Sequence, residues 1–100
     1  MNYFAIELKP DKDKRYKFLV LDRKSGKHKK VKFGSKKGST FIDHHSLVKK
    51  KNYIARHSKL NEDWEDPFTA GFWARWYLWS EPTIPEAEDL MERKFGITFI

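Results

Sequence analysis

Seven lysines lie within fourteen residues in the first half of the chain, and they form the strongest chemical signal in the sequence. Closely spaced cations are the electrostatic footprint of proteins that bind phosphate backbones. Lysine is a point charge rather than a planar fork, which favours backbone contact over readout of base edges. The cluster predicts binding of DNA or RNA with little sequence specificity, the alternative being a solvated face that only aids solubility. Its members are Lys24, Lys27, Lys29, Lys30, Lys32, Lys36 and Lys37, and the further cations Lys49, Lys50 and Arg56 extend the predicted surface.

Two arginines and a histidine in the second half of the chain suggest an anion pocket. Arg56, His57 and Arg75 lie on predicted helices, and an arginine among apolar helix residues needs a carboxylate or an anionic ligand. In the favoured interpretation, Arg56 and Arg75 are locked internally by a carboxylate. In the other, Arg56, His57 and Arg75 converge on a phosphate. The carboxylates considered for the lock are Asp43, Glu65 and Asp66.

Acidic and histidine clusters are weaker candidates for catalysis. The run Asp43-His44-His45, with His57 downstream, lacks the His-x-x-x-His spacing of zinc sites, so hydrogen bonding or capping is the favoured role. The chain has no cysteine and neither glycine-rich nucleotide-phosphate motif. We therefore expect no enzymatic activity, no metal and no cofactor, with a metal-dependent nuclease as the alternative. That alternative would place Mg²⁺ on a carboxylate cluster that also suits helix capping: Glu62, Asp63, Glu65 and Asp66.

Four tryptophans lie within sixteen residues, which is more than one helix face can bury. Most of them are expected in the core. Trp73 or Trp79 is expected to be an exposed anchor for a protein partner, because large aromatic side chains dominate such contacts. The tryptophans are Trp64, Trp73, Trp76 and Trp79.

Three stretches of the sequence resemble a family signature: Lys32-Phe33-Gly34-Ser35, Tyr53-Ile54-Ala55-Arg56-His57, and Trp64-x-x-Pro67-x-Thr69-Ala70-Gly71-Phe72-x-x-Arg75-Trp76-x-Leu78-Trp79. The family comprises short, uncharacterised proteins of large nucleocytoplasmic DNA viruses. The resemblance covers about residues 30–96 and implies a viral origin without an established activity. It implies a location in the cytoplasm or nucleus of the infected cell, with packaging in the virion as a further option. The matched positions include Arg56, His57, Asp66, Thr69, Arg75 and Trp79.

The elements that position these residues begin with three strands. Residues Tyr3–Lys9 alternate between apolar and polar side chains, which is typical of a half-buried strand. Tyr16–Asp22 is apolar on both faces, as in a central strand, and His28–Phe33 alternates again. Gly26 lies in the turn between the second and third strands, where it is free to adopt positive φ. Residues 1–34 are thus predicted to form a three-stranded antiparallel β-meander.

Three helices are predicted to follow in residues 35–100. The first is capped by Asp43 or Ser46 and runs to about Ser58. The central, Trp-rich helix starts at Asp66-Pro67 and spans Phe68–Trp79. The third begins in a capping box at Thr83 and Glu86 and ends at Gly96, after which Ile97–Ile100 offers a short edge strand. The prediction is a single α+β domain over residues 1–100.

The charge of the chain is divided between its two parts. Residues 1–60 carry a net charge of +13 and residues 61–100 a net charge of −6, which together give +7. This asymmetry favours an anionic partner for the first part, unless the acidic part packs against it and neutralises it. No apolar run approaches the ~18–20 residues of a membrane span, so no membrane partner is expected.

Two functions remain in competition. The first is a small basic nucleic-acid-binding protein of a DNA virus. The second is a structural virion component, a minor capsid or cement protein, held to other viral structural proteins by Trp and Phe contacts. Because a dipolar protein can pair with copies of itself, self-association is a further expectation.

Overall fold

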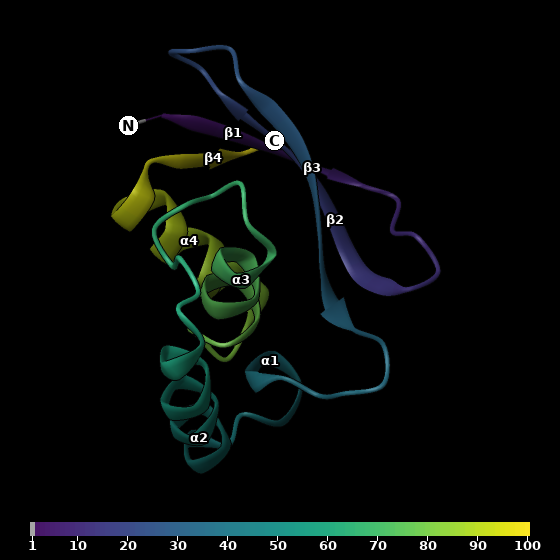
Figure 1. Cartoon of the computed structure of the whole chain (residues 1–100), viewed down its shortest axis with the longest axis vertical. Helices are drawn as coiled ribbons and strands as arrows, with labels where there is room; N and C mark the ends of the chain where they lie inside the picture. Colours follow the sequence, from purple (N-terminus) through teal and green to yellow (C-terminus); the bar gives the residue numbers. More distant parts are fainter. Residues whose placement is uncertain (1) are drawn as a thin grey trace.

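The protein has an α+β fold in which one four-stranded sheet is covered by helices on one face (Figure 1). The computed structural model describes residues 2–100. The strand order is β3-β2-β1-β4. β2 pairs antiparallel with both β1 and β3, and β4 pairs parallel with β1. The strands are β1 (Tyr3–Leu8), β2 (Lys14–Asp22), β3 (His28–Ser35) and β4 (Ile97–Phe99).

The fourth strand corrects the predicted three-stranded meander. Strands β1 to β3 form the antiparallel meander, but β4 makes the sheet mixed. Gly96 ends the last helix in the left-handed region at φ 68°, and its carbonyl accepts a hydrogen bond from the Tyr3 N–H at 3.0 Å. The turn therefore places the buried Ile97 beside Tyr3. The pairing joins the two ends of the chain, so it depends on how the helices between them pack.

The helical part contains one short helix and one wide turn that the sequence pattern did not predict. Helix α2 begins after Ser46, whose side chain accepts from the Lys49 N–H, and α4 begins after Thr83, whose side chain accepts from the Glu86 N–H. Both predicted helix starts are confirmed. The Glu86 carboxylate accepts from the Thr83 hydroxyl at 2.8 Å, which replaces the backbone N–H that a complete capping box would use. The elements are α1 (Phe41–His44), α2 (Leu47–His57), the 3₁₀ turn η1 (Ser58–Leu60), α3 (Ala70–Trp73), the π-helical turn η2 (Ala74–Leu78) and α4 (Ile84–Phe95).

The central helix starts later than predicted and widens at its end. The Asp66 carboxylate accepts from the Phe68 N–H inside a turn, and Thr69 is the N-cap, accepting from the Phe72 N–H. The helix then continues into η2. In a π-helical turn each backbone hydrogen bond joins residues five positions apart, which widens the helix. The residues four and five positions after Trp73 can therefore face the same side. Both of these residues, Tyr77 and Leu78, are buried against the sheet.

Trp73 lies at the centre of the core. Its side chain is fully buried and stacks on Phe18 of β2, with ring centroids 4.7 Å apart. Its Nε1–H donates to the Pro67 carbonyl at 2.8 Å, which satisfies the only polar atom of the ring. The prediction of Trp73 as an exposed protein anchor is therefore wrong. A helix with aromatic residues on several faces does not reveal from sequence which face meets the sheet.

An ion pair ties β2 to α1. The Arg15 guanidinium binds the Asp43 carboxylate through two hydrogen bonds of 2.8 and 3.0 Å, and Asp43 also accepts from the Thr40 N–H at 2.7 Å. Hydrogen bonding to Arg15, more than to Thr40, lowers the Asp43 pKa to about 2. The prediction that Asp43 could lock Arg56 or Arg75 is therefore wrong, because Asp43 pairs with Arg15.

Replacing Asp43 with asparagine is expected to give a pH-dependent loss of stability. The folded pKa lies below the unfolded value, so the ionised carboxylate stabilises the fold above about pH 4, and this contribution is lost as the pH falls towards 2. The Asp43 side chain is about one-third exposed, so after screening by solvent we expect about 1 kcal/mol at neutral pH. Thermal unfolding of both proteins between pH 2 and 7 measures this. A gap in melting temperature that persists unchanged at pH 2 contradicts the role of the ion pair.

Candidate nucleic-acid interface

The predicted lysine cluster follows one edge of the sheet. β3 is the outermost strand on one side of the sheet, and lysines lie on it, on the β2–β3 turn before it and on the loop after it. All seven side chains are exposed. Six of them have no ion-pair partner among residues 2–100, and the seventh, Lys32, lies 3.5 Å from Asp11 and 3.6 Å from Asp13. The edge strand thus carries a run of cations that the described chain leaves largely unneutralised.

The three predicted cations of α2 differ in availability. The Lys50 ammonium donates to the Ser80 carbonyl at 2.6 Å and lies 5.0 Å from the Phe41 ring centroid, so it helps to attach α2 to the rest of the fold. Lys49 and Arg56 are exposed and have no ion pair within the described residues. Lys49 and Arg56 can therefore add to the basic surface.

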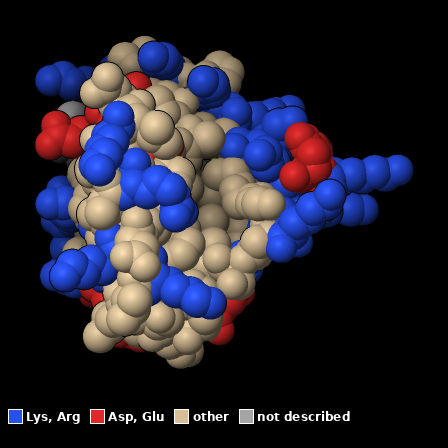
Figure 2. Space-filling view, turned by 60° about the horizontal axis from the view of Figure 1, so that its bottom comes forward, with Lys and Arg blue, Asp and Glu red and all other residues tan. Residues whose placement is uncertain are grey.

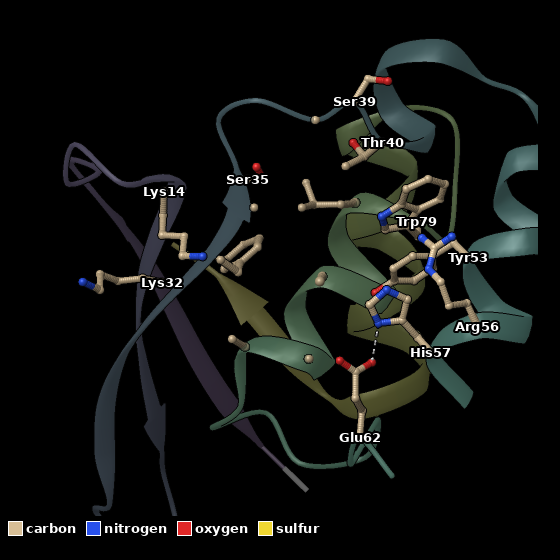
Figure 3. A pocket seen from close by; sticks show the side chains of 17 residues that line it. Lys14, Lys32, Ser35, Ser39, Thr40, Tyr53, Arg56, His57, Glu62 and Trp79 are labelled. Carbon is tan, nitrogen blue, oxygen red and sulfur yellow. Dashed lines mark hydrogen bonds and ion pairs between the residues drawn. The ribbon is translucent and has the colours of Figure 1, made fainter. Parts of the chain in front are cut away.

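A cavity of about 390 Å³ lies between β3 with its following loop, α2, and the helix formed by α3 and η2. Its apolar lining includes Phe33 and Leu78. Figure 3 shows Lys14 pointing towards the cavity from the strand side and Arg56 on the opposite wall, whereas the Lys32 side chain points away. The arrangement brings cations from distant parts of the chain to the two sides of one space.

Tyr53 lines this cavity, although the sequence points to it only through the family resemblance and not as a candidate site residue. Its ring stacks parallel to Trp79 at 4.4 Å and lies 4.1 Å from the His57 ring. The side chain is 4% exposed, and its hydroxyl has no hydrogen-bond partner in the part of the chain that the structure describes. Burial raises the Tyr53 pKa, with a smaller contribution from Glu62, so the hydroxyl stays protonated and remains a donor.

Glu62 holds His57 at the edge of the cavity. His57 Nδ1 lies 3.1 Å from Glu62 Oε1, and the Trp64 Nε1–H donates to the same oxygen at 3.1 Å. A Cβ on Gly71 would lie 3.3 Å from Glu62 Cδ, so the absence of a side chain at Gly71 leaves room for the carboxylate. An imidazole fixed by a carboxylate is well oriented for hydrogen bonding to a ligand.

The other acidic and histidine residues have local roles. Asp63 Oδ1 accepts from the Glu65 N–H at 3.0 Å, and Asp66 lies in the turn before α3. His44 Nδ1 accepts from the Ser46 N–H at 3.0 Å, and His45 ends α1 with a φ of 57°. Among residues 2–100 no three His, Asp or Glu side chains gather in a way that could hold a metal ion.

Arg75 contacts aromatic rings instead of a carboxylate. Its guanidinium carbon lies 4.2 Å from the Trp76 centroid and 5.4 Å from that of Trp64, and its Nε and Nη1 are buried without a hydrogen-bond partner in residues 2–100. Burial lowers the Arg75 pKa. The predicted lock by Asp66, Glu65 or Asp43 is wrong for this arginine, since cation–π contacts take its place. Arg75 does not line the cavity either, so only Arg56 and His57 of the predicted pocket do.

The tryptophans divide between core, cavity and surface. Trp79, the second predicted anchor, is half-buried and forms part of the cavity wall. Trp64 and Trp76 are also half-buried and line a separate depression with Lys94 and Phe95. Trp64, Trp76 and Trp79 thus keep part of their surface accessible, whereas Trp73 does not.

No helix among residues 2–100 has the length and apolar character needed to cross a membrane.

Comparison with known proteins gives one match. No curated protein matches the chain, and no solved structure matches it. A family model described as "Family of unknown function (DUF5754)" matches residues 5–57. The match spans β1 to β3, α1 and α2, and therefore includes the lysine-bearing edge strand together with Tyr53, Arg56 and His57. The chain belongs to this family.

Proposed function

We propose that the protein binds nucleic acid through the phosphate backbone, with little sequence specificity. The observation that carries this proposal is that the basic part of the chain is not neutralised by the acidic part. In the described residues, every ion pair of a Lys or Arg joins two groups within 2–60 or two within 61–100. The excess positive charge of residues 2–60 therefore faces solvent, where a polyanion can release counterions by binding.

The shape of the basic surface suits an extended polyanion. An eight-residue strand such as β3 spans about 26 Å, and the flanking turns lengthen the run of cations. Lysines on an edge strand also discourage pairing with other strands, but that role does not explain Lys24, Lys36 and Lys37 beyond the strand ends. Figure 2 shows Lys and Arg side chains on both sides of a hollow in the surface, with few Asp or Glu side chains nearby.

The resemblance to proteins of large DNA viruses supplies a setting for the proposal. The partner would be viral or host DNA or RNA in the cytoplasm or nucleus of an infected cell. The chain would act by binding alone, without a cofactor. The matched family model covers β1 to β3, α1 and α2, so the Trp-rich stretch of the resemblance lies outside it.

Binding to labelled oligonucleotides tests the proposal. Fluorescence anisotropy at 50 mM salt is expected to give micromolar or tighter dissociation constants for 20-nucleotide probes. Because phosphate contacts carry no sequence information, probes of mixed sequence and homopolymers should differ by less than about tenfold. A preference of 100-fold or more for one sequence contradicts backbone recognition.

A structural virion component remains the second candidate. Apolar side chains are exposed on α2 and η1, with Leu47 at 71%, Val48 at 69% and Leu60 at 60%, and a protein partner would cover them. This candidate predicts that the tagged protein, purified from infected cells, retains a viral structural protein after nuclease treatment. Loss of all partners after nuclease treatment favours nucleic-acid binding instead.

A further inference from the structure

The cavity beside Tyr53 has the size and lining of a site for a small organic group. Its volume of about 390 Å³ falls in the ~300–1,000 Å³ range of ligand pockets. Phe33 and Leu78 supply apolar surface, and the small residues Gly71 and Ala74 let a flat group approach the α3–η2 backbone. A strip of this kind between polar walls accepts a planar ring.

The cations and the carboxylate of the cavity lie at different places on its walls. Lys14 and Arg56, on opposite walls, have no ion pair within residues 2–100, so each is available to an anionic group that enters the cavity (Figure 3). Glu62 lies at another side of the cavity, where its Oε1 already accepts from Trp64. A carboxylate repels phosphate but accepts hydrogen bonds from hydroxyl and amino groups. A ligand with an anion at one end and hydrogen-bond donors at the other fits this arrangement.

The Tyr53 hydroxyl is a third sign of a ligand. It is buried and unpartnered in the described chain, although a buried hydroxyl without an acceptor destabilises a fold. Phenylalanine at this position would preserve the ring stack with Trp79 and His57 without that cost. An acceptor that a ligand brings to this hydroxyl would remove that cost.

We propose that this cavity holds one unpaired nucleotide of a bound single strand. The phosphate lies against one of the two cations, Lys14 or Arg56, the base lies along the lining formed by Phe33, Leu78 and Ala74, and a sugar hydroxyl or base amino group faces Glu62. This inference rests on the proposed function and adds the preferred substrate. Base pairs keep their bases stacked inside the helix, so the cavity selects single strands over duplexes.

Two uncharged substitutions test the cavity without altering the electrostatic surface. Tyr53→Phe removes only the hydroxyl, and Ala74→Leu fills the floor. Each variant is titrated with a labelled 20-nucleotide single strand and with the corresponding duplex. Tyr16→Phe is the matched control, because it makes the same chemical change outside the cavity.

Both variants are expected to weaken binding of the single strand by five- to tenfold and to leave binding of the duplex unchanged. Tyr16→Phe should change neither. Tyr53→Phe should also melt at the same temperature as the parent protein or higher, which a purely structural role of the hydroxyl does not predict. Equal effects of the cavity variants on single strand and duplex, or no effect on either, overturn the inference. If the parent protein binds neither probe, the proposed function itself fails.

Discussion

Replacing Trp73 with alanine is expected to lower the free energy of unfolding by about 3–5 kcal/mol, as for other large aromatic residues removed from a protein core. The fully buried ring contacts the aromatic residues of the sheet, including Phe18 at 4.7 Å and Phe33 at 5.5 Å. Its removal leaves a cavity and an unpaired Pro67 carbonyl. Since domains of this size are stable by only about 5–15 kcal/mol, urea titration of the variant should show a large shift in the unfolding midpoint.

Trp64→Ala is the control for this substitution. Trp64 is half-buried and contacts Arg75. Trp64→Ala should therefore lower the free energy of unfolding by less than half as much as Trp73→Ala. Similar losses for the two variants would mean that the sheet is not packed around Trp73 as described.

Neutralising the β2–β3 turn and the start of β3 should produce the largest loss of nucleic-acid affinity. The variant combines Lys24→Gln, Lys27→Gln, Lys29→Gln and Lys30→Gln. If all four lysines contact phosphates, counterion release predicts a loss of roughly 10³-fold at 0.1 M salt for a B-DNA duplex. Anisotropy titration with a labelled duplex measures the loss.

A second variant, with the same change in net charge at other positions, shows whether the position of the lysines or the net charge of the protein determines affinity. Lys9→Gln, Lys12→Gln, Arg93→Gln and Lys94→Gln also reduce the net charge from +7 to +3. These positions lie outside the proposed surface, so the affinity should fall by less than about tenfold. Equal losses in the two variants would show that overall charge, and not the edge of the sheet, determines binding.

The parts of the fold that the sequence predicts are those fixed by neighbouring residues. Alternating side chains at Tyr3–Lys9 and His28–Phe33 identify β1 and β3, because the period of two belongs to the strand itself. Ser46, Thr83 and Gly96 mark helix ends, because each cap bonds to backbone groups within four residues. The basic surface follows from composition in the same way, since exposed lysines need no partner.

The features that the sequence does not predict depend on contacts between distant residues. Arg15 and Asp43 are 28 positions apart, and no local pattern favours this pair over the lock proposed for Arg56 and Arg75. The stack of Tyr53 on Trp79 joins α2 to the end of η2. The cavity likewise combines side chains from β2, β3, α2 and η2, so no motif in one stretch of sequence signals it.

The salt dependence of binding tests the central claim most directly. Affinity for a labelled single strand, measured between 50 and 300 mM salt, should fall linearly on a logarithmic plot. Five or more phosphate contacts predict a slope of about −3.5 or steeper, because each contact with a single strand contributes about −0.7. A steep slope supports a protein whose exposed lysine edge displaces counterions from a nucleic-acid backbone. A slope near zero, or no binding at 50 mM salt, would contradict it.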